Sequence, residues 1–305
     1  MKREFTYTIT DKEDGISILR FLKNNGYSKN VIKELKKTPE GIHRNGVWTY
    51  VNGILHTGDT LHLCLIEDAG SENIVPNAAP LDILYEDDDI FVINKAAGMP
   101  THPSISHYEN TLANALAAYN EERNTPMVFR CINRLDMDTS GLTVVAKHML
   151  SSGHLGDDMK ARKIHREYLG IAEGLVEDSG TICAPIGRAE GSVIERKVDF
   201  ANGEHAVTHF KRLKYLPADS PECSGSKNGL SLVSFLLETG RTHQIRVHMK
   251  HIGHPLIGDF LYNPANQLMT RQALHAWHLT FSHPINGEKM TFEAPVPDDF
   301  ILLPD

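Results

Sequence analysis

One short segment of the chain carries side chains whose types and spacing could do chemistry. Residues 132–147 read INRLDMDTSGLTVVAK, so Asp136 lies in a polar stretch that leads directly into an apolar, strand-like run. A carboxylate that a scaffold holds in such a loop can act as a nucleophile or as a general base. The alternative is an ordinary turn, in which Asp138, Thr139 and Ser140 satisfy backbone groups. Composition alone does not decide between these interpretations.

Further motifs accompany this segment in a fixed order. YEDDDIFVINKAAG at 85–98 is followed by REYLG at 166–170, TGRTHQIRVH at 239–248 and GHPLIGD at 253–259. Together with RLDMDTSG, these motifs closely resemble the signature of the RluA-type pseudouridine synthases, over residues 81–297. The resemblance implies an enzyme without metal or cofactor that isomerises uridine to pseudouridine in structured RNA. The expected substrate is large-subunit ribosomal RNA, and transfer RNA is the alternative.

The resemblance assigns the chemistry to three side chains. Pseudouridine formation breaks the N-glycosidic bond, rotates the uracil and rejoins it through carbon five. Asp136 is then the nucleophile, and Arg246 is the cation that orients this carboxylate and keeps it ionised. Tyr168 is expected to stack on the target base and to serve in the late proton transfer. Ile245 is a candidate apolar wall, and plain core packing is the alternative for Ile245 and Tyr168.

Other residues of these motifs are expected to hold the RNA. A uridine inside folded RNA must be flipped out, and we expect Arg134 to fill the gap, because a guanidinium can stack in place of a base. A pairing of Arg134 with Asp138 is the alternative. Arg241 and His243 precede a predicted helix, where they are expected to contact phosphates.

Asn133 departs from the family pattern, whose commonest form has histidine at this position. An amide can still form hydrogen bonds but cannot titrate near neutral pH. Because the resemblance places the chemistry on Asp136, we expect activity to survive this change. Altered contacts with RNA are the alternative.

Two other functions compete with this one. His243, His248, His251 and His254 could form the metal site of a hydrolase, since His248 and His251 have ligand spacing on one face of a helix. The chain has no HExxH motif and no cysteine beside them, which favours packing or phosphate contacts instead. The other alternative is a catalytically silent RNA-binding protein, which would not require an aspartate, a tyrosine and an arginine in these motifs.

The elements that must position these residues predict an α+β domain over residues 81–305. Strand-like runs outnumber helical patterns, and neither a βαβ alternation nor a GxGxxG motif is present. We therefore predict a mixed, largely antiparallel central sheet with flanking helices and an active-site cleft. Predicted strands cover 90–94, 142–147, 168–173, 208–215, 230–238 and 272–281, and predicted helices cover 111–122, 154–163 and 242–252.

A small N-terminal α/β module is predicted over residues 1–70, followed by a linker at 71–80. Its pattern is a strand at 4–9, two helices, and strands at 43–51 and 60–66 that are joined by Asn52-Gly53 and Gly58-Asp59 turns. This order resembles the small RNA-binding module named after ribosomal small-subunit protein four. Ser28 is expected to cap the second helix. The polar face of this helix carries four lysines that we expect to contact RNA, namely Lys29, Lys33, Lys36 and Lys37.

Composition and charge are compatible with this interpretation. The 305 residues include 41% hydrophobic and 23% charged side chains, enough to fold as two domains. The formal net charge of −8 opposes RNA binding, but seven basic residues against two acidic ones gather between residues 20 and 47. The four cysteines have no CxxC spacing, no apolar run could span a bilayer, and the N-terminus has no apolar signal core. We expect a cytoplasmic RNA-binding protein that contacts no membrane and needs no protein partner, and the sequence leaves its oligomeric state open.

Overall fold

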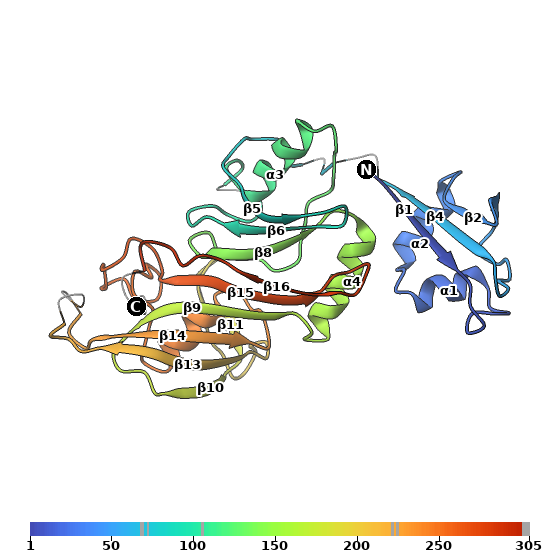
Figure 1. The fold of residues 1–305 in the computed structure, drawn as a ribbon. Helices are drawn as coiled ribbons and strands as arrows, with labels where there is room; N and C mark the ends of the chain where they lie inside the picture. Colours follow the sequence, from blue (N-terminus) through green and yellow to red (C-terminus); the bar gives the residue numbers. More distant parts are fainter. Residues whose placement is uncertain (68–69, 72, 105–106, 221–222, 224–225, 301–305) are drawn as a thin grey trace.

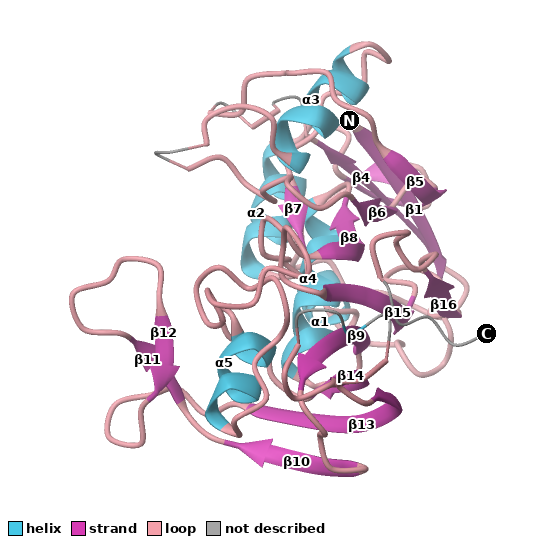
Figure 2. Ribbon diagram, turned by 90° about the vertical axis from the view of Figure 1, so that its left-hand side faces the viewer, coloured by secondary structure: helices cyan, strands magenta, loops and turns pink. Residues whose placement is uncertain are grey.

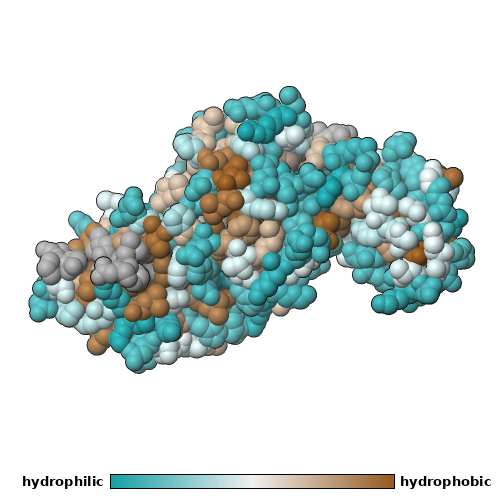
Figure 3. All heavy atoms as spheres, in the orientation of Figure 1, coloured by the Kyte–Doolittle hydropathy of each residue, from teal (hydrophilic) through white to brown (hydrophobic). Residues whose placement is uncertain are grey.

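The computed structural model describes the chain except for residues 68, 69, 72, 105, 106, 221, 222, 224, 225 and 301–305. Residues 68, 69 and 72 belong to the region around the predicted linker, and 301–305 end the predicted catalytic domain; both groups lie outside the described residues. A small N-terminal sheet and a large sheet share no strand (Figure 1). On the face shown in Figure 3 the two parts form lobes that meet at a narrower waist, and hydrophobic atoms gather mainly on the larger lobe.

The N-terminal sheet is antiparallel and has two helices packed on it. Apolar side chains of both helices, among them Leu22 and Leu35, are buried together with Leu61 and Leu63 of the sheet. Ser28 caps the second helix as predicted, and its hydroxyl accepts a hydrogen bond of 3.3 Å from the backbone N–H of Val31. The strand order is β1 (Lys2–Thr8), β4 (Thr60–Ile66), β2 (Ile42–Arg44) and β3 (Val47–Trp48), and the helices are α1 (Ile18–Asn24) and α2 (Lys29–Lys37).

The strand predicted over residues 43–51 was wrong, because the chain turns back within it. Asn45 and Gly46 both have positive φ, 52° and 77°, and they connect β2 to β3. Two such residues in succession are typical of a tight hairpin turn, and Asn-Gly is the sequence that favours it most. The Asn45-Gly46 pair could therefore have been recognised beside the Asn52-Gly53 pair.

The large sheet is mixed and largely antiparallel, which confirms the predicted fold class. Only the pairing of β8 with β15 is parallel among the described strands. The main path runs β10 (Ser179–Cys183), β13 (Val207–Leu216), β14 (Leu230–Leu237), β9 (His165–Glu173), β15 (Leu274–Ser282), β8 (Ser140–Ala146), β6 (Ile90–Lys95) and β5 (Asp82–Glu86). β16 (Lys289–Glu293) pairs with β15, β7 (Arg130–Cys131) pairs with β8, and β11 (Ile186–Arg188) with β12 (Arg196–Val198) forms a separate hairpin.

Three helices flank this sheet, and each overlaps a predicted helix: α3 (Leu112–Glu121), α4 (Met149–Lys160) and α5 (Gln244–His251). α5 lies beside β13, and the β11–β12 hairpin projects on its other side (Figure 2). α4 begins earlier than predicted, at Met149, because the side chain of His148 accepts a hydrogen bond from the backbone N–H of Ser151 and caps the helix. No helix among the described residues is long and apolar enough to cross a membrane.

The N-terminal module packs directly onto the start of α4. Leu150 belongs to the hydrophobic core of the module, and Met149 and Ile285 pack against that core. The carboxylate of Glu67 forms an ion pair with Arg130 and accepts a hydrogen bond of 2.7 Å from the backbone N–H of Met149. The two parts therefore share apolar contacts and not only a connecting chain.

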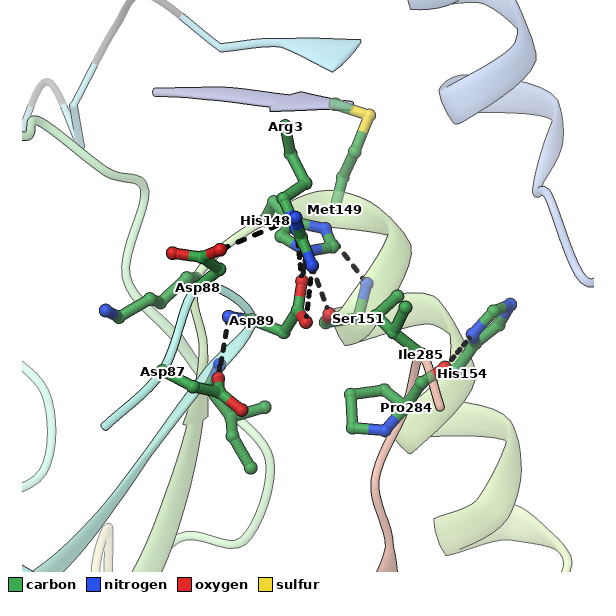
Figure 4. Close-up of polar contacts among 12 residues, drawn as sticks. Arg3, Asp87, Asp88, Asp89, His148, Met149, Ser151, His154, Pro284 and Ile285 are labelled. Carbon is green, nitrogen blue, oxygen red and sulfur yellow. Dashed lines mark hydrogen bonds and ion pairs between the residues drawn. The ribbon is translucent and has the colours of Figure 1, made fainter. Parts of the chain in front are cut away.

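A buried polar cluster reinforces this junction (Figure 4). The guanidinium of Arg3 in β1 donates two hydrogen bonds, of 2.8 and 3.1 Å, to the two carboxylate oxygens of Asp89. Nε2 of His148 lies 2.8 Å from the same carboxylate. Burial alone would raise the pKa of Asp89, but its hydrogen bonds with His148 and Arg3 outweigh burial and lower the pKa to about 2. The carboxylate is therefore ionised and holds the two parts together.

We predict that Asp89→Asn lowers the free energy of unfolding by roughly 2 kcal/mol at pH 7, because the folded pKa lies below the usual value of about 3.9. Since folding lowers this pKa, the contribution is complete above about pH 5 and is lost as pH falls towards 2. Denaturant unfolding of wild type and variant at pH 7 and at about pH 3.5 measures both effects.

Asp88→Asn is the matched control, because the side chain of Asp88 is 79% exposed and lies 3.5 Å from Arg3. It should change stability by about 0.5 kcal/mol or less. An equal loss in both variants, or a difference between wild type and Asp89→Asn that does not shrink in acid, would contradict the assignment.

Candidate active site

The loop between β7 and β8 carries Asp136. A glycine at the end of this loop allows β8 to pair closely with β15. Gly141 has φ +107°, and a Cβ at this position would lie 2.2 Å from the backbone oxygen of Ala276 in β15. Only glycine permits so close an approach of the two strands, which pair in parallel at this point. The backbone N–H of Thr139 donates to the carbonyl of Asp136, at 3.1 Å, and closes the turn.

Buried side chains from other elements fix the backbone of this loop. Nζ of Lys95, at the end of β6, donates hydrogen bonds of 2.7, 2.8 and 3.0 Å to the carbonyls of Ala96, Met99 and Met137. The hydroxyl of Thr101 donates to the carbonyl of Leu135, at 2.9 Å. Burial lowers the pKa of Lys95 to about 7, although the charges of Asp136 and Asp138 oppose this. The loop that carries Asp136 is thus preorganised before any substrate binds.

Asn133 also fixes the loop. Its amide nitrogen donates to the carbonyl of Leu142, and its amide oxygen accepts from the backbone N–H of Val144, each at 2.9 Å. Both polar atoms of this buried side chain are therefore occupied by β8. A neutral amide is well suited to this arrangement, because it carries one donor and one acceptor group and needs no proton exchange.

Arg246 in α5 binds Asp136 and a second aspartate at the same time. Its Nη1 donates a hydrogen bond of 3.1 Å to Oδ2 of Asp136. Its Nε and Nη2 donate to both carboxylate oxygens of Asp259, at 2.7 and 2.8 Å. Burial disfavours the charge of Arg246, but its hydrogen bond with Asp259 and the charges of both aspartates outweigh burial and raise its pKa. The bidentate bond fixes the plane of the guanidinium, and this plane fixes the direction from which Asp136 is held.

Tyr168 and Ile245 form apolar walls of the same cleft, which has a volume of about 520 Å³. Tyr168, from β9, is 5% exposed, and Ile245, from α5, is 3% exposed. Burial and the charge of Asp136 raise the pKa of Tyr168 above its ordinary value, although Arg166 opposes them. Tyr168 is therefore a neutral phenol at neutral pH. The structure brings together Asp136, Tyr168, Ile245 and Arg246, all of which line the cleft.

The cleft is also lined by Arg134, Arg241 and His243, which differ in their exposure and in their partners. Arg134 is exposed, and among the described residues its side chain forms no hydrogen bond or ion pair, including with Asp138. Arg241 is exposed and paired with Glu204. Nδ1 of His243 lies 2.9 Å from the hydroxyl of Tyr262, and Nε2 lies 3.9 Å from Asp136. Burial lowers the pKa of His243, so this side chain offers a neutral imidazole instead of a cation.

The lysines of α2 are far from this arrangement in the fold, since they lie in the other lobe. Lys29, Lys33, Lys36 and Lys37 are all exposed, and none of them lines the cleft. Lys37 is paired with Glu34 of the same helix at 3.3 Å.

The histidines that could form a metal site do not converge. Nδ1 of His248 lies 2.9 Å from the hydroxyl of Thr208, and Nε2 lies 2.9 Å from the carbonyl of Ala184, so both ring nitrogens are engaged. His243 faces Tyr262 and Asp136 instead. In the part of the chain that the structure describes, the one group with metal-ligand geometry is Asp87, Asp89 and His283. It belongs to the polar cluster of the domain junction, where Arg3 and His148 already occupy Asp89.

Two residues that sequence reasoning did not single out complete the site. Asp259 is fully buried, and its Oδ1 also accepts hydrogen bonds of 3.0 Å from the backbone N–H groups of Leu261 and Tyr262. Lys95 fixes the loop as described above. Both residues stand within recognised motifs, GHPLIGD and INKAAG, so their position could have been inferred, but their partners could not.

This geometry places a carboxylate, held by a buried arginine, in a cleft that six cationic side chains line. A family model described as RNA pseudouridylate synthase matches residues 89–251. Together with full-length relatives, this match shows that the chain belongs to the RNA pseudouridylate synthase family. The activity of this family is the isomerisation of uridine in RNA, as the motif resemblance implied.

Several relatives are similar over most of their length. The "Uncharacterized RNA pseudouridine synthase YhcT" of Bacillus subtilis (strain 168) is 40% identical over 293 residues, which are 95% of this chain and 93% of the relative. "Ribosomal large subunit pseudouridine synthase D" of Pseudomonas aeruginosa is 38% identical over 265 residues, which are 82% of this chain and 78% of the relative. The solved structure of human RNA pseudouridylate synthase domain containing 1 matches with a TM-score of 0.57 at 26% identity and covers 73% of this chain and 86% of that chain.

We predict that Asp259→Asn lowers kcat roughly 10 to 100-fold and changes KM less, because it weakens the bond that orients Arg246 and thereby misplaces Asp136. Steady-state kinetics on an RNA substrate measures the two parameters separately. Asp178→Asn is the control, since the side chain of Asp178 is 89% exposed and pairs with Arg212 on β13. Unchanged kcat in Asp259→Asn would show that Arg246 needs no support from this carboxylate.

Proposed function

We propose that this protein converts uridine to pseudouridine in large-subunit ribosomal RNA, with Asp136 as the nucleophile. The observation that carries the proposal is the carboxylate of Asp136 in a cleft walled by Tyr168, with Arg246 held against it by Asp259. A cleft of about 520 Å³ has the size of a small-molecule site and can receive one flipped nucleotide.

Each side chain then has a distinct task. The carboxylate of Asp136 attacks the target nucleotide, and the hydrogen bond from Arg246 keeps this carboxylate oriented within the cleft. The ring of Tyr168 stacks on the uracil, and its neutral hydroxyl is available for the late proton transfer. Ile245 forms an apolar wall that excludes water from the reacting atoms.

The RNA contacts extend outward from this centre. Arg134 is exposed at the cleft and has no partner among the described residues, so it is free to enter the gap that the flipped uridine leaves. Arg241 and His243 stand at the start of α5, where a phosphate of the RNA can replace Glu204 as the partner of Arg241. The choice of large-subunit ribosomal RNA rests on the names of relatives such as pseudouridine synthase D.

The N-terminal module, residues 1–70, is proposed to be a second RNA contact that resembles the module of ribosomal small-subunit protein four, linked through 71–80 to the catalytic domain at 81–305. Its support is the exposed lysine face of α2. The polar cluster at the junction holds this face in a fixed relation to the cleft. No disulfide joins the four cysteines in the described part of the chain, which is compatible with a reducing compartment, and we propose that the protein acts in the cytoplasm.

Pseudouridine mapping tests the proposed function. Carbodiimide-stop sequencing of ribosomal and transfer RNA should show sites that are present with the wild-type protein and absent with Asp136→Ala, because the variant lacks the carboxylate that attacks. Loss of sites in transfer RNA alone would move the substrate to that RNA. An identical map for wild type and variant, with both proteins expressed, would favour a catalytically silent RNA-binding protein.

Charge removal on α2 tests the second RNA contact without disturbing the junction. Changing Lys29, Lys33, Lys36 and Lys37 together to Gln should weaken binding to ribosomal RNA and lower the slope of log Kd against log salt by about 2 or more, since each phosphate contact contributes roughly 0.7 to 0.9. Filter binding over a range of KCl concentrations measures the slope.

The control carries four Lys→Gln changes at exposed positions outside α2 and outside the cleft, namely Lys12, Lys197, Lys211 and Lys289. Equal slopes for the two variants would mean that the lysines of α2 act only through net charge. A slope equal to that of the wild type in the α2 variant would contradict the contact itself.

A further inference from the structure

Six cationic side chains line the cleft, and two of them lack a carboxylate partner. Lys160, Arg162, Arg241 and Arg246 form ion pairs with Asp157, Glu238, Glu204, and Asp136 with Asp259, respectively. Among the described residues, the side chains of Arg134 and Arg166 form no hydrogen bond or ion pair. Arg134 is exposed, and water can solvate it, whereas Arg166 is 8% exposed. Arg166 is therefore a buried cation for which the described part of the chain supplies no carboxylate.

Such a group is unusual, because removal of a charge from water is costly unless hydrogen bonds and an opposite charge replace the water. The Nε of Arg166 is inaccessible to solvent and has no hydrogen-bond acceptor. Among the described residues, no carboxylate lies within ion-pair distance of the guanidinium, and only its Nη groups, which are not among the buried unpartnered atoms, can be reached from the cleft. A compensating partner that arrives with the substrate would explain why the position carries arginine.

The surroundings of Arg166 place it inside the substrate cleft. Arg166 and Tyr168 stand two residues apart in β9 and line the same cleft, so they lie on one face of the strand about 7 Å apart. The guanidinium lies under the turn that leads to α5, because a Cβ on Gly240 would be 2.7 Å from its Nη1. Gly240 thus lets this turn close over the arginine.

We propose that Arg166 binds a backbone phosphate of the RNA next to the target uridine. This inference rests on the proposed function. The phosphodiester is the group of RNA that carries a negative charge, and a guanidinium fork binds phosphate oxygens through two parallel hydrogen bonds. The spacing between Tyr168 and Arg166 is on the scale of one nucleotide, so a base that stacks on Tyr168 brings its own sugar-phosphate towards Arg166.

A phosphate contact and a structural role predict opposite effects of Arg166→Met on stability. If Arg166 awaits a phosphate, the variant removes an uncompensated buried charge, and the midpoint of thermal unfolding stays equal or rises. Its affinity for a large-subunit ribosomal RNA transcript should fall about tenfold, and the slope of log Kd against log salt should fall by about 1. Arg166→Lys keeps the charge and should therefore keep the wild-type slope. Its Kd should lie between those of the wild type and Arg166→Met.

Arg212→Met is the matched control, because Arg212 is a half-buried arginine of β13 that already has partners, Asp178 and the carbonyl of Val176, and does not line the cleft. It should lower the unfolding midpoint and leave the salt slope at the wild-type value. A wild-type Kd and slope in Arg166→Met would overturn the proposal, and so would a loss of slope that is the same in Arg166→Lys and Arg212→Met.

The release of tritium from RNA that contains [5-³H]uridine, with the wild-type protein and the same transcript, reports the proposed function separately. Release by the wild type together with unchanged binding of Arg166→Met would remove the phosphate contact and leave the proposed function intact. Absence of release by the wild type would count against the proposed function, while the binding data would still decide the role of Arg166.

Discussion

The bond from Arg246 to Asp136 is the interaction on which the rest of the site depends. An arginine that is 3% exposed is stable only when its donors are satisfied, and Asp259 takes two of them while Asp136 takes a third. The two aspartates come from loops far apart in the sequence, so the arginine also joins the β7–β8 loop to the segment after α5. Preorganisation of this kind places the cost of orienting the carboxylate in folding and not in the reaction.

The surrounding fold keeps this geometry fixed. Lys95 and Thr101 tie the loop of Asp136 to the end of β6, and Asn133 ties its other end to β8. Gly141 lets β8 lie against β15, which in turn pairs with β9, the strand of Tyr168 and Arg166. Tyr168 and Arg166 are therefore in the same sheet to which the loop of Asp136 is tied, so the three side chains have little freedom to move relative to one another.

The sequence predicted the sheet class, the six long strands and the three helices, because their apolar periodicity is strong over many residues. It missed the short strands β5, β7, β10, β11, β12 and β16, where few residues are buried and pairing with a neighbour decides the conformation. It also merged β2 and β3 into one strand across the Asn45-Gly46 turn. The start of α4 was predicted too late, because it is set by the capping side chain of His148 and not by apolar periodicity.

For the site, the motifs identified Asp136, Tyr168, Ile245 and Arg246 as a set, and the structure places them in one cleft. The partners were not predictable, because a motif states which residue is present and not what it contacts. Asp259, Lys95 and the unpaired state of Arg166 emerge only from three-dimensional packing. Burial lowers the pKa of His243, and its ring contacts the hydroxyl of Tyr262. Neither the burial nor this contact can be inferred from the residues beside it in the sequence.

The most direct test of the central claim uses an isosteric change of the carboxylate. Because the new bond forms at carbon five of the uracil, the reaction releases the hydrogen from that carbon, and RNA that contains [5-³H]uridine reports each turnover. We expect the wild type to release tritium from large-subunit ribosomal RNA in a single turnover, and Asp136→Asn to bind the same RNA without releasing it. Release by Asp136→Asn at a rate close to that of the wild type would contradict the assignment of Asp136 as the nucleophile.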